Sequence, residues 1–169
     1  MNSEPILFYD RRGVLVTPRT HSVVKPRTGA WIVPKSKDSL LLLWPSFAGG
    51  IPDLPGGGVD EGETLLQAAA REWGEETGLP FVPVSGPLAQ HHQVRGFYAE
   101  DQDEFWIYDQ TFFLYAFDRA QEIGARWLNP EGDVVAWVGF NDIQAAQLNR
   151  AHWLAVQALV PELNRKEEK

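Results

Sequence analysis

The chain has 169 residues, of which 44% are hydrophobic and 22% are charged, the composition of an ordinary globular domain. Its 15 Lys and Arg residues against 23 Asp and Glu give a formal net charge of −8, which disfavours nucleic-acid polymers and anionic membranes as partners. The absence of cysteine excludes disulfides, zinc–thiolate sites and cysteine nucleophiles, and it fits a reducing compartment.

The N-terminal third is expected to contain short strands and structured loops. We predict one domain over residues 1–169, with an N-terminal extension, residues 1–28, that holds a hairpin of strands 6–9 and 14–17. A polar, basic loop is expected at residues 18–28. Two apolar strands joined as a second hairpin and a Gly- and Pro-rich loop are then predicted at residues 30–33, 40–44 and 47–58.

The clearest predicted helix covers residues 63–77. Leu65, Ala69 and Trp73 recur every four residues and give this helix a buried stripe. Gly78, followed shortly by a proline, predicts where the helix ends.

Two long strands, residues 88–98 and 104–117, are predicted next, joined by an acidic turn. The second strand has apolar side chains on both faces, which indicates a central strand covered on both sides. The remaining predicted elements are a strand at 134–138, a short helix at 141–148, a second helix at 149–160 and a frayed charged tail at 164–169. A mixed sheet between helices, an α/β/α sandwich of the α/β class, accommodates all of these elements.

Three glutamates near the end of the first helix carry the strongest chemical signal. Glu72, Glu75 and Glu76 lie at spacings i, i+3 and i+4, so their carboxylates share one helix face. Acids in the last turns of a helix oppose its dipole, which suggests that a positive ion lies opposite them. Clustered carboxylates without His or Cys suit Mg²⁺, with Mn²⁺ as a substitute, rather than zinc. A solvated acidic helix face is the plainer alternative.

The segment GGGVDEGETLLQAAAREWGEETGL, residues 56–79, resembles the Nudix box, whose pattern is G-x5-E-x7-R-E-U-x-E-E-x-G-U with U a bulky apolar residue. Every fixed position and both apolar positions are filled, by Gly57, Glu63, Arg71, Glu72, Trp73, Glu75, Glu76, Gly78 and Leu79. Trp73 is larger than the aliphatic residue usual at its position. The resemblance implies a Nudix hydrolase, an enzyme that uses a divalent metal and water to cut a diphosphate linkage.

The resemblance also implies roles for particular residues. Glu72, Glu75 and Glu76 would bind the metal together with the carbonyl of Gly56, and Arg71 would orient the glutamates. Glu63 would stabilise the loop rather than act chemically. We therefore expect Arg71, Glu72 and Glu75 among the catalytic residues.

A further metal ligand or general base is expected from outside the box, in the acidic turn between the two long strands. Glu104 is the best candidate there because it begins a strand, where a rigid backbone could aim it. An exposed polar turn is the alternative. Other side chains could meet a phosphate or a base, although strand polarity, core packing or a solvated loop explains them equally well: His91, His92, Trp31, Trp44, Trp106, Arg19, Lys25, Arg27 and Lys35.

The expected substrate is a small phosphorylated metabolite, a nucleoside diphosphate linked to a group X, with a nucleoside triphosphate favoured. ADP-ribose and dinucleoside polyphosphates are alternatives, as is a non-catalytic nucleotide-binding regulator with the same fold. Isomerases that share the fold rely on a cysteine, which this chain lacks. No signal peptide is apparent and the longest apolar run, residues 40–44, is too short to cross a bilayer, so a cytoplasmic location is expected. A homodimer is expected only because family members are often dimers.

Overall fold

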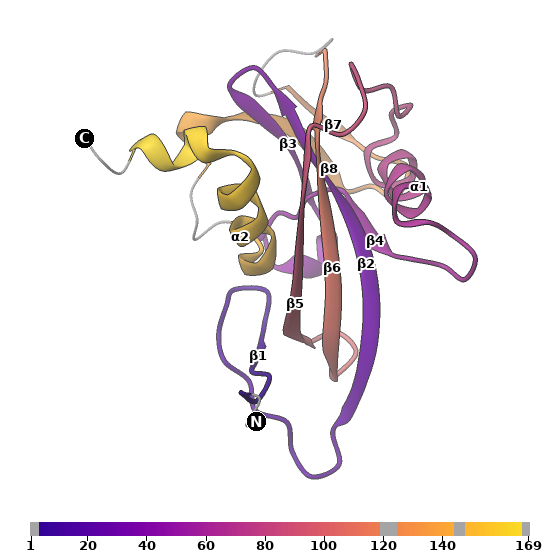
Figure 1. The fold of residues 1–169 in the computed structure, drawn as a ribbon, viewed down its shortest axis with the longest axis vertical. Helices are drawn as coiled ribbons and strands as arrows, with labels where there is room; N and C mark the ends of the chain where they lie inside the picture. The colour runs from indigo at the N-terminus through magenta and orange to yellow at the C-terminus, as the bar shows by residue number, and fades with distance from the viewer. Residues whose placement is uncertain (1–3, 119–124, 144–147, 167–169) are drawn as a thin grey trace.

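A computed structural model of the chain describes residues 4–118, 125–143 and 148–166. These residues form one mixed sheet with helix α1 (Leu65–Thr77) on one face and helix α2 (Arg150–Leu159) on the other, the predicted α/β/α sandwich (Figure 1). The strands are β1 (Phe8–Tyr9), β2 (Val23–Ser36), β3 (Ser39–Trp44), β4 (Gly56–Gly58), β5 (Ala89–Ala99), β6 (Glu104–Ala116), β7 (Arg126–Leu128) and β8 (Val134–Gly139). No described helix has the length and apolar character needed to cross a membrane.

Strands β5, β6 and β2 form the long centre of the sheet, which runs in the order β1-β5-β6-β2-β3-β8-β7. β6 pairs antiparallel with β5 and parallel with β2, so the prediction of a central strand is confirmed. The predicted loop at residues 18–28 is wrong from Val23 onward, because β2 pairs with β6 from Val23 to Lys35. Backbone hydrogen bonds to β6 thus hold a polar segment as strand although its side chains lack an apolar pattern.

Strands β2 and β3 separate soon after their hairpin, and the space between them determines where the site forms. They pair only at Lys35↔Leu40 and Ser36↔Ser39. The segment that follows β3 returns to fill the gap, bridging Leu43↔Asp53 on one side and pairing as β4 with β2 on the other. The predicted loop at 47–58 is therefore wrong for Gly56–Gly58, which are a strand, and a 3-10 helix covers Ser46–Ala48.

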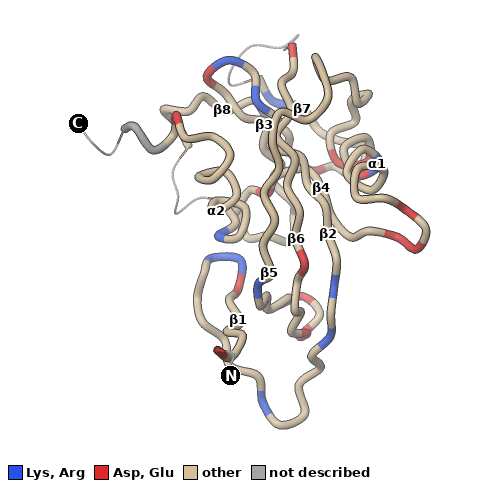
Figure 2. The backbone as a smooth tube through the Cα atoms, in the orientation of Figure 1, with Lys and Arg blue, Asp and Glu red and all other residues tan. Residues whose placement is uncertain are grey.

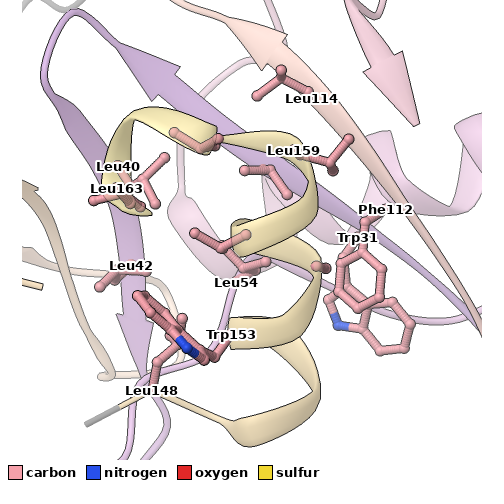
Figure 3. Close-up of a cluster of buried hydrophobic side chains, with 14 of the residues drawn as sticks. Trp31, Leu40, Leu42, Leu54, Phe112, Leu114, Leu148, Trp153, Leu159 and Leu163 are labelled. Atoms are coloured by element: carbon pink, nitrogen blue, oxygen red, sulfur yellow. The ribbon is translucent and has the colours of Figure 1, made fainter. Parts of the chain in front are cut away.

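Each helix covers its own apolar cluster, and alternate residues of β6 face the two clusters. On the α2 side, Phe112 stacks on Trp31 with ring centroids 5.0 Å apart, and Leu159 packs nearby (Figure 3). On the α1 side, Trp73 is 1% exposed and stacks on Phe117 at 4.6 Å. The rigid central sheet thus fixes both helices relative to each other.

Several terminal predictions can be compared with the structure. Residues 6–9 and 14–17 do fold back on each other, through the hydrogen bonds Val16 N→Phe8 O and Asp10 N→Val14 O, but only Phe8–Tyr9 is a strand and Leu15 forms an isolated bridge to Tyr9. The helix expected at 141–148 is a 3-10 turn, Phe140–Asp142, and residues 144–147 lie outside the described part. The tail expected to fray from 164 is a 3-10 helix, Pro161–Lys166, and residues 167–169 are likewise not described.

Candidate active site

Three consecutive glycines bring the chain from the sheet to α1 without room for side chains. A Cβ on Gly56 would lie 2.4 Å from the carbonyl oxygen of Ala30, and its φ of +148° is one that L side chains rarely adopt. A Cβ on Gly57 would lie 2.9 Å from Oε1 of Glu72. Glycine at both positions therefore lets backbone and a carboxylate come within contact distance.

Helix α1 begins two residues later than predicted because Thr64 caps it. The Thr64 hydroxyl accepts from the Gln67 N–H at 3.1 Å, and the Gln67 side chain accepts from the Thr64 N–H at 2.9 Å. Gly78 ends the helix in the left-handed conformation, as expected, with φ of 73°. Trp73 is locked in the core, and Glu72 and Glu76 lie next to it on the side of the helix that contacts β4. Figure 2 shows acidic residues on α1 and the loop before it.

Arg71 joins the helix to the loop before it. Its guanidinium donates to Glu63 at 2.8 and 2.9 Å, to the carbonyl of Gly58 at 3.1 Å and to Glu72 at 3.1 Å. Its contacts to Glu75 are longer, 3.3 and 3.4 Å. The hydrogen bonds from Arg71 hold the pKa of Glu63 down to about 2. Glu63 thus serves as a permanent anchor for Arg71, which agrees with a structural role.

Glu72 and Glu76 lie side by side, one helical turn apart, and both are partly buried. Burial raises the pKa of Glu76 well above its usual value, and the charges of Glu72 and Asp53 raise it further. Burial likewise raises the pKa of Glu72, against the opposing influence of Arg71. Two carboxylates this close ionise fully only if a cation joins them.

The donor set fits a hard divalent cation. Carboxylate oxygens and a backbone carbonyl are the protein ligands that Mg²⁺ and Mn²⁺ favour, and water or phosphate completes the shell. In the described residues no three His, Cys, Asp or Glu side chains are already grouped as a metal-binding set. The reason is that Glu75 is 51% exposed and contacts Arg71 rather than Glu72 and Glu76.

A cleft of about 300 Å³ opens beside this pair, near the lower end of the range for small-molecule sites. Asp53 lies within it, ion-paired with Arg11 and accepting from the Asn149 amide at 2.9 Å. Arg11 comes from the N-terminal hairpin and lies 5.2 Å over the ring of Phe47. The residues that line the cleft are Arg11, Trp31, Leu43, Pro45, Phe47, Asp53, Gly56, Gly57, Glu72, Glu76, Phe97, Ala99, Asp101, Gln102, Trp106, Tyr108, Gln110, Glu131, Asp133, Asn149, Ala151 and His152.

The structure brings Gly56, Glu72 and Glu76 to the cleft, leaves Glu75 exposed on Arg71 outside the cleft lining, and separates Glu104 from them. Glu104 does not line the cleft; it accepts from Lys25 at 2.8 Å and from the indole of Trp106 at 2.8 Å. Those two donors lower the pKa of Glu104. From the acidic turn it is Asp101 that lines the cleft instead.

The other singled-out residues divide in the same way. Trp31 and Trp106 line the cleft, whereas Trp44 packs at the edge of the α2-side core. His91 bonds to Gln93 at 3.0 Å, and the exposed His92 pairs with Asp109 at 2.7 Å. None of the basic candidates lines the cleft: Lys25 pairs with Glu104, Arg27 lies 4.4 Å over the Trp106 ring, Lys35 pairs with Glu162, and Arg19 caps a turn with Ser22.

Eight polar residues of the cleft were not predicted from the sequence: Arg11, Asp53, Gln102, Gln110, Glu131, Asp133, Asn149 and His152. Asn149 was recognised only as a helix cap, which it is, accepting from the Ala151 N–H at 3.1 Å. Asp53 had a usable signal, an acid three residues before the glycines in a Pro-rich loop. The others are brought in by packing between distant segments, which no local pattern records.

Comparison with known proteins decides the family, because the NUDIX domain model matches residues 6–159. The chain belongs to the Nudix family. Among solved structures it is similar to a bifunctional NMN adenylyltransferase/ADP ribose pyrophosphatase from Francisella tularensis (TM-score 0.64, 18% identity, 82% of this chain covered), of which it spans 41%. It is also similar to the dihydroneopterin triphosphate pyrophosphohydrolase of E. coli (TM-score 0.57, 18% identity, 83% of this chain and 99% of that one). The Nudix hydrolase RenU from M. Smegmatis gives a TM-score of 0.55 at 18% identity over 92% of this chain and 96% of that one. At such identities these Nudix structures support the shared fold.

Proposed function

We propose that this Nudix protein hydrolyses a diphosphate linkage in a small nucleotide, a nucleoside diphosphate joined to a group X such as a further phosphate. The observation that supports this most is the pair Glu72 and Glu76, two partly buried carboxylates in contact at the wall of a cleft of about 300 Å³. Such an arrangement is costly for the fold alone, and it is accounted for if a cation and a phosphate chain bind there.

Glu72, Glu76 and the carbonyl of Gly56 would hold Mg²⁺, with Mn²⁺ as a substitute. When bound, the cation neutralises the diphosphate and lowers the pKa of coordinated water. Arg71 keeps Glu72 fixed in the meantime, since its guanidinium is anchored by Glu63 and the carbonyl of Gly58. Phosphoryl transfer depends mainly on such positioning and charge neutralisation.

Glu75 is the carboxylate assigned to proton transfer. It is half-exposed, its contacts to Arg71 are long, and it does not share the buried environment of Glu72 and Glu76. A water oxygen attacks one phosphorus, its proton passes to a Glu75 oxygen, and the bond to the bridging oxygen breaks. The two products each carry a phosphate group, and the proton leaves Glu75 to solvent.

The test is release of inorganic phosphate and pyrophosphate over a panel of nucleoside triphosphates, ADP-ribose and dinucleoside polyphosphates, with Mg²⁺ and with chelator. We expect turnover that requires the cation and that falls by about 100-fold or more in Glu75→Gln, with an unchanged melting curve. Glu61→Gln is the matched control, because Glu61 is an exposed glutamate in the loop before α1 and lies outside the cleft. Near-normal turnover in Glu75→Gln, or no cation-dependent release with any substrate, would overturn the proposal.

A further inference from the structure

Gln110 is a buried side-chain amide at the cleft wall opposite the box glutamates. It is only 3% exposed, although it is polar, and it lies on the face of β6 that also presents Tyr108 and Phe112. It lines the cleft together with Trp31 and His152. A side-chain amide that is this buried requires hydrogen-bond partners, so the partners of Gln110 indicate its role.

The orientation of the Gln110 amide is fixed by a relay through Gln93. The carbonyl of Ala151 can only accept, so the Gln93 group that lies 3.1 Å from it is the NH2. The same NH2 donates to the Gln110 carbonyl at 2.9 Å, while the Gln93 carbonyl lies 3.0 Å from Nε2 of His91. The Gln110 carbonyl is therefore occupied, and no described group accepts from the NH2 of Gln110.

His152 supplies a second donor of the same kind. Its Nδ1 accepts from the backbone N–H of Leu54 at 3.0 Å, which places the ring proton on Nε2. The ring is 3% exposed and is held between Trp31 and Phe112, with centroids 5.3 and 5.5 Å away. No described group accepts from Nε2. This wall of the cleft therefore has two neutral donors, the Gln110 NH2 and the His152 Nε2–H, that no described group accepts from.

A single trapped water does not account for both donors. Gln110 also borders a small cavity of about 10 Å³, beside Tyr9 and Arg150, which has room for one water at most. His152 does not border that cavity and lines the large cleft. Buried donors left unpaired in the free protein are a recognised means of selecting a ligand that brings acceptors.

Resting on the function proposed above, we propose that Gln110 and His152 bind the heterocycle of the substrate and select one that carries a ring carbonyl oxygen. The aromatic side chains of Trp31, Phe97 and Tyr108 line the same cleft and offer apolar surface to a planar ring. Because the Gln110 carbonyl already accepts from Gln93 and its NH2 is the group left without an acceptor, an exocyclic amino group in place of that oxygen would set donor against donor. The protein thus favours oxo bases over amino bases.

The test is equilibrium binding of two pairs of monophosphates that differ at this edge: inosine against adenosine 5′-monophosphate, and uridine against cytidine 5′-monophosphate. Binding is measured by quenching of tryptophan fluorescence or by calorimetry, so it needs no turnover. We expect the oxo member of at least one pair to bind about tenfold tighter or more, the effect of one buried donor meeting a wrong partner. Equal affinity within both pairs, or no binding of any of the four, would overturn the inference.

Three variants separate recognition of the base from effects on folding. In Gln110→Leu the preference should fall to near unity, whereas Gln90→Leu, on the exposed surface of β5, should keep it. In Gln93→Leu the Gln110 amide is released and can turn its carbonyl to the cleft, so affinity for the amino member should rise. A merely structural Gln93 would not raise that affinity, and a preference that survives in both Gln110→Leu and Gln93→Leu would contradict the inference.

The hydrolysis assay and the binding assay test the two proposals separately. Oxo selectivity without turnover would contradict the proposed function and leave the recognition intact. Turnover of nucleotides with equal affinity for oxo and amino members would contradict the recognition alone.

Discussion

The two walls of the cleft are built from the same fold but carry opposite kinds of polar group. The wall from α1 carries the carboxylates of Glu72 and Glu76, whose pKa values are raised by burial. The wall from β6 and α2 carries Gln110 and His152, which are neutral and donate. The comparison teaches that the two walls suit different parts of the proposed substrate, the acidic wall a cation with its phosphates and the neutral wall an uncharged ring.

The largest expected effect comes from removing one charge of the acidic wall, by Glu76→Gln. Turnover with Mg²⁺ should fall by about 100-fold or more because a cation ligand is lost. In chelator, the same variant should be more stable than wild type by about 1 kcal/mol or more, since a raised carboxyl pKa marks a destabilised charge. Melting and steady-state assays of the same preparation measure both.

If Glu76→Gln destabilises the metal-free protein instead, the Glu76 carboxylate is not unfavourable there, and the proposed difference between the two walls is wrong. Glu61→Gln, exposed and nearby, should change neither quantity.

Arg71→Lys tests whether the acidic wall must be held in place. Lysine cannot bridge Glu63, the Gly58 carbonyl and Glu72 at once, as the planar guanidinium does. We expect cation affinity to fall by about 10–100-fold, the usual cost of losing a group that orients ligands. Calorimetric titration with Mg²⁺ measures it, and an unchanged affinity would mean that Arg71 is dispensable for the site.

The neutral wall should make the folding stability depend on pH through His152. Burial lowers the pKa of His152 to about 4, although the charge of Asp53 works in the other direction. Between about pH 6.5 and 4, His152 therefore binds a proton in the unfolded chain but not in the folded one. The free energy of unfolding falls by about 3 kcal/mol as the pH drops across that window. Above pH 6.5 this contribution is constant.

His152→Asn keeps an acceptor for the Leu54 N–H but does not titrate. Denaturant melts at pH 7 and pH 4.5 should show that the stability gap between wild type and variant narrows at the lower pH. The comparison cancels Glu72 and Glu76, whose raised pKa values act in the opposite sense. A gap that stays constant would mean that His152 is protonated in the folded protein.

The smallest effect is expected at Glu104, which the sequence suggested as a base or ligand. It is committed to Lys25 and Trp106 outside the cleft, so Glu104→Gln should change turnover by less than about threefold. A loss as large as that of Glu75→Gln would return Glu104 to the reaction.

The same comparison explains how much could be predicted from the sequence. The acidic wall lies in one helix and its loop, so spacing alone placed Glu72 and Glu76 on one helix face, and the resemblance to the Nudix box added Gly56. The helix, the central strand and the sandwich followed from periodicity for the same reason. Glu75 was expected to converge with them, but its contact with Arg71 depends on side-chain rotamers that spacing does not specify.

The neutral wall could not be predicted because it is assembled from distant segments. Gln110 and His152 meet only when α2 docks on β6, and Arg11 reaches Asp53 across 42 positions of the chain. Likewise, β2 begins at Val23 because β6 lies beside it, and nothing within residues 18–28 announces that partner. Local patterns record local contacts, and these contacts are not local.

The most direct test of the central claim is a titration with Mn²⁺, followed by its paramagnetic resonance signal, in wild type and in the double variant Glu72→Gln/Glu76→Gln. We predict saturable binding to wild type that Mg²⁺ displaces, and loss of that binding in the variant while its melting temperature in chelator rises. Equal binding of Mn²⁺ by the two proteins would contradict the account.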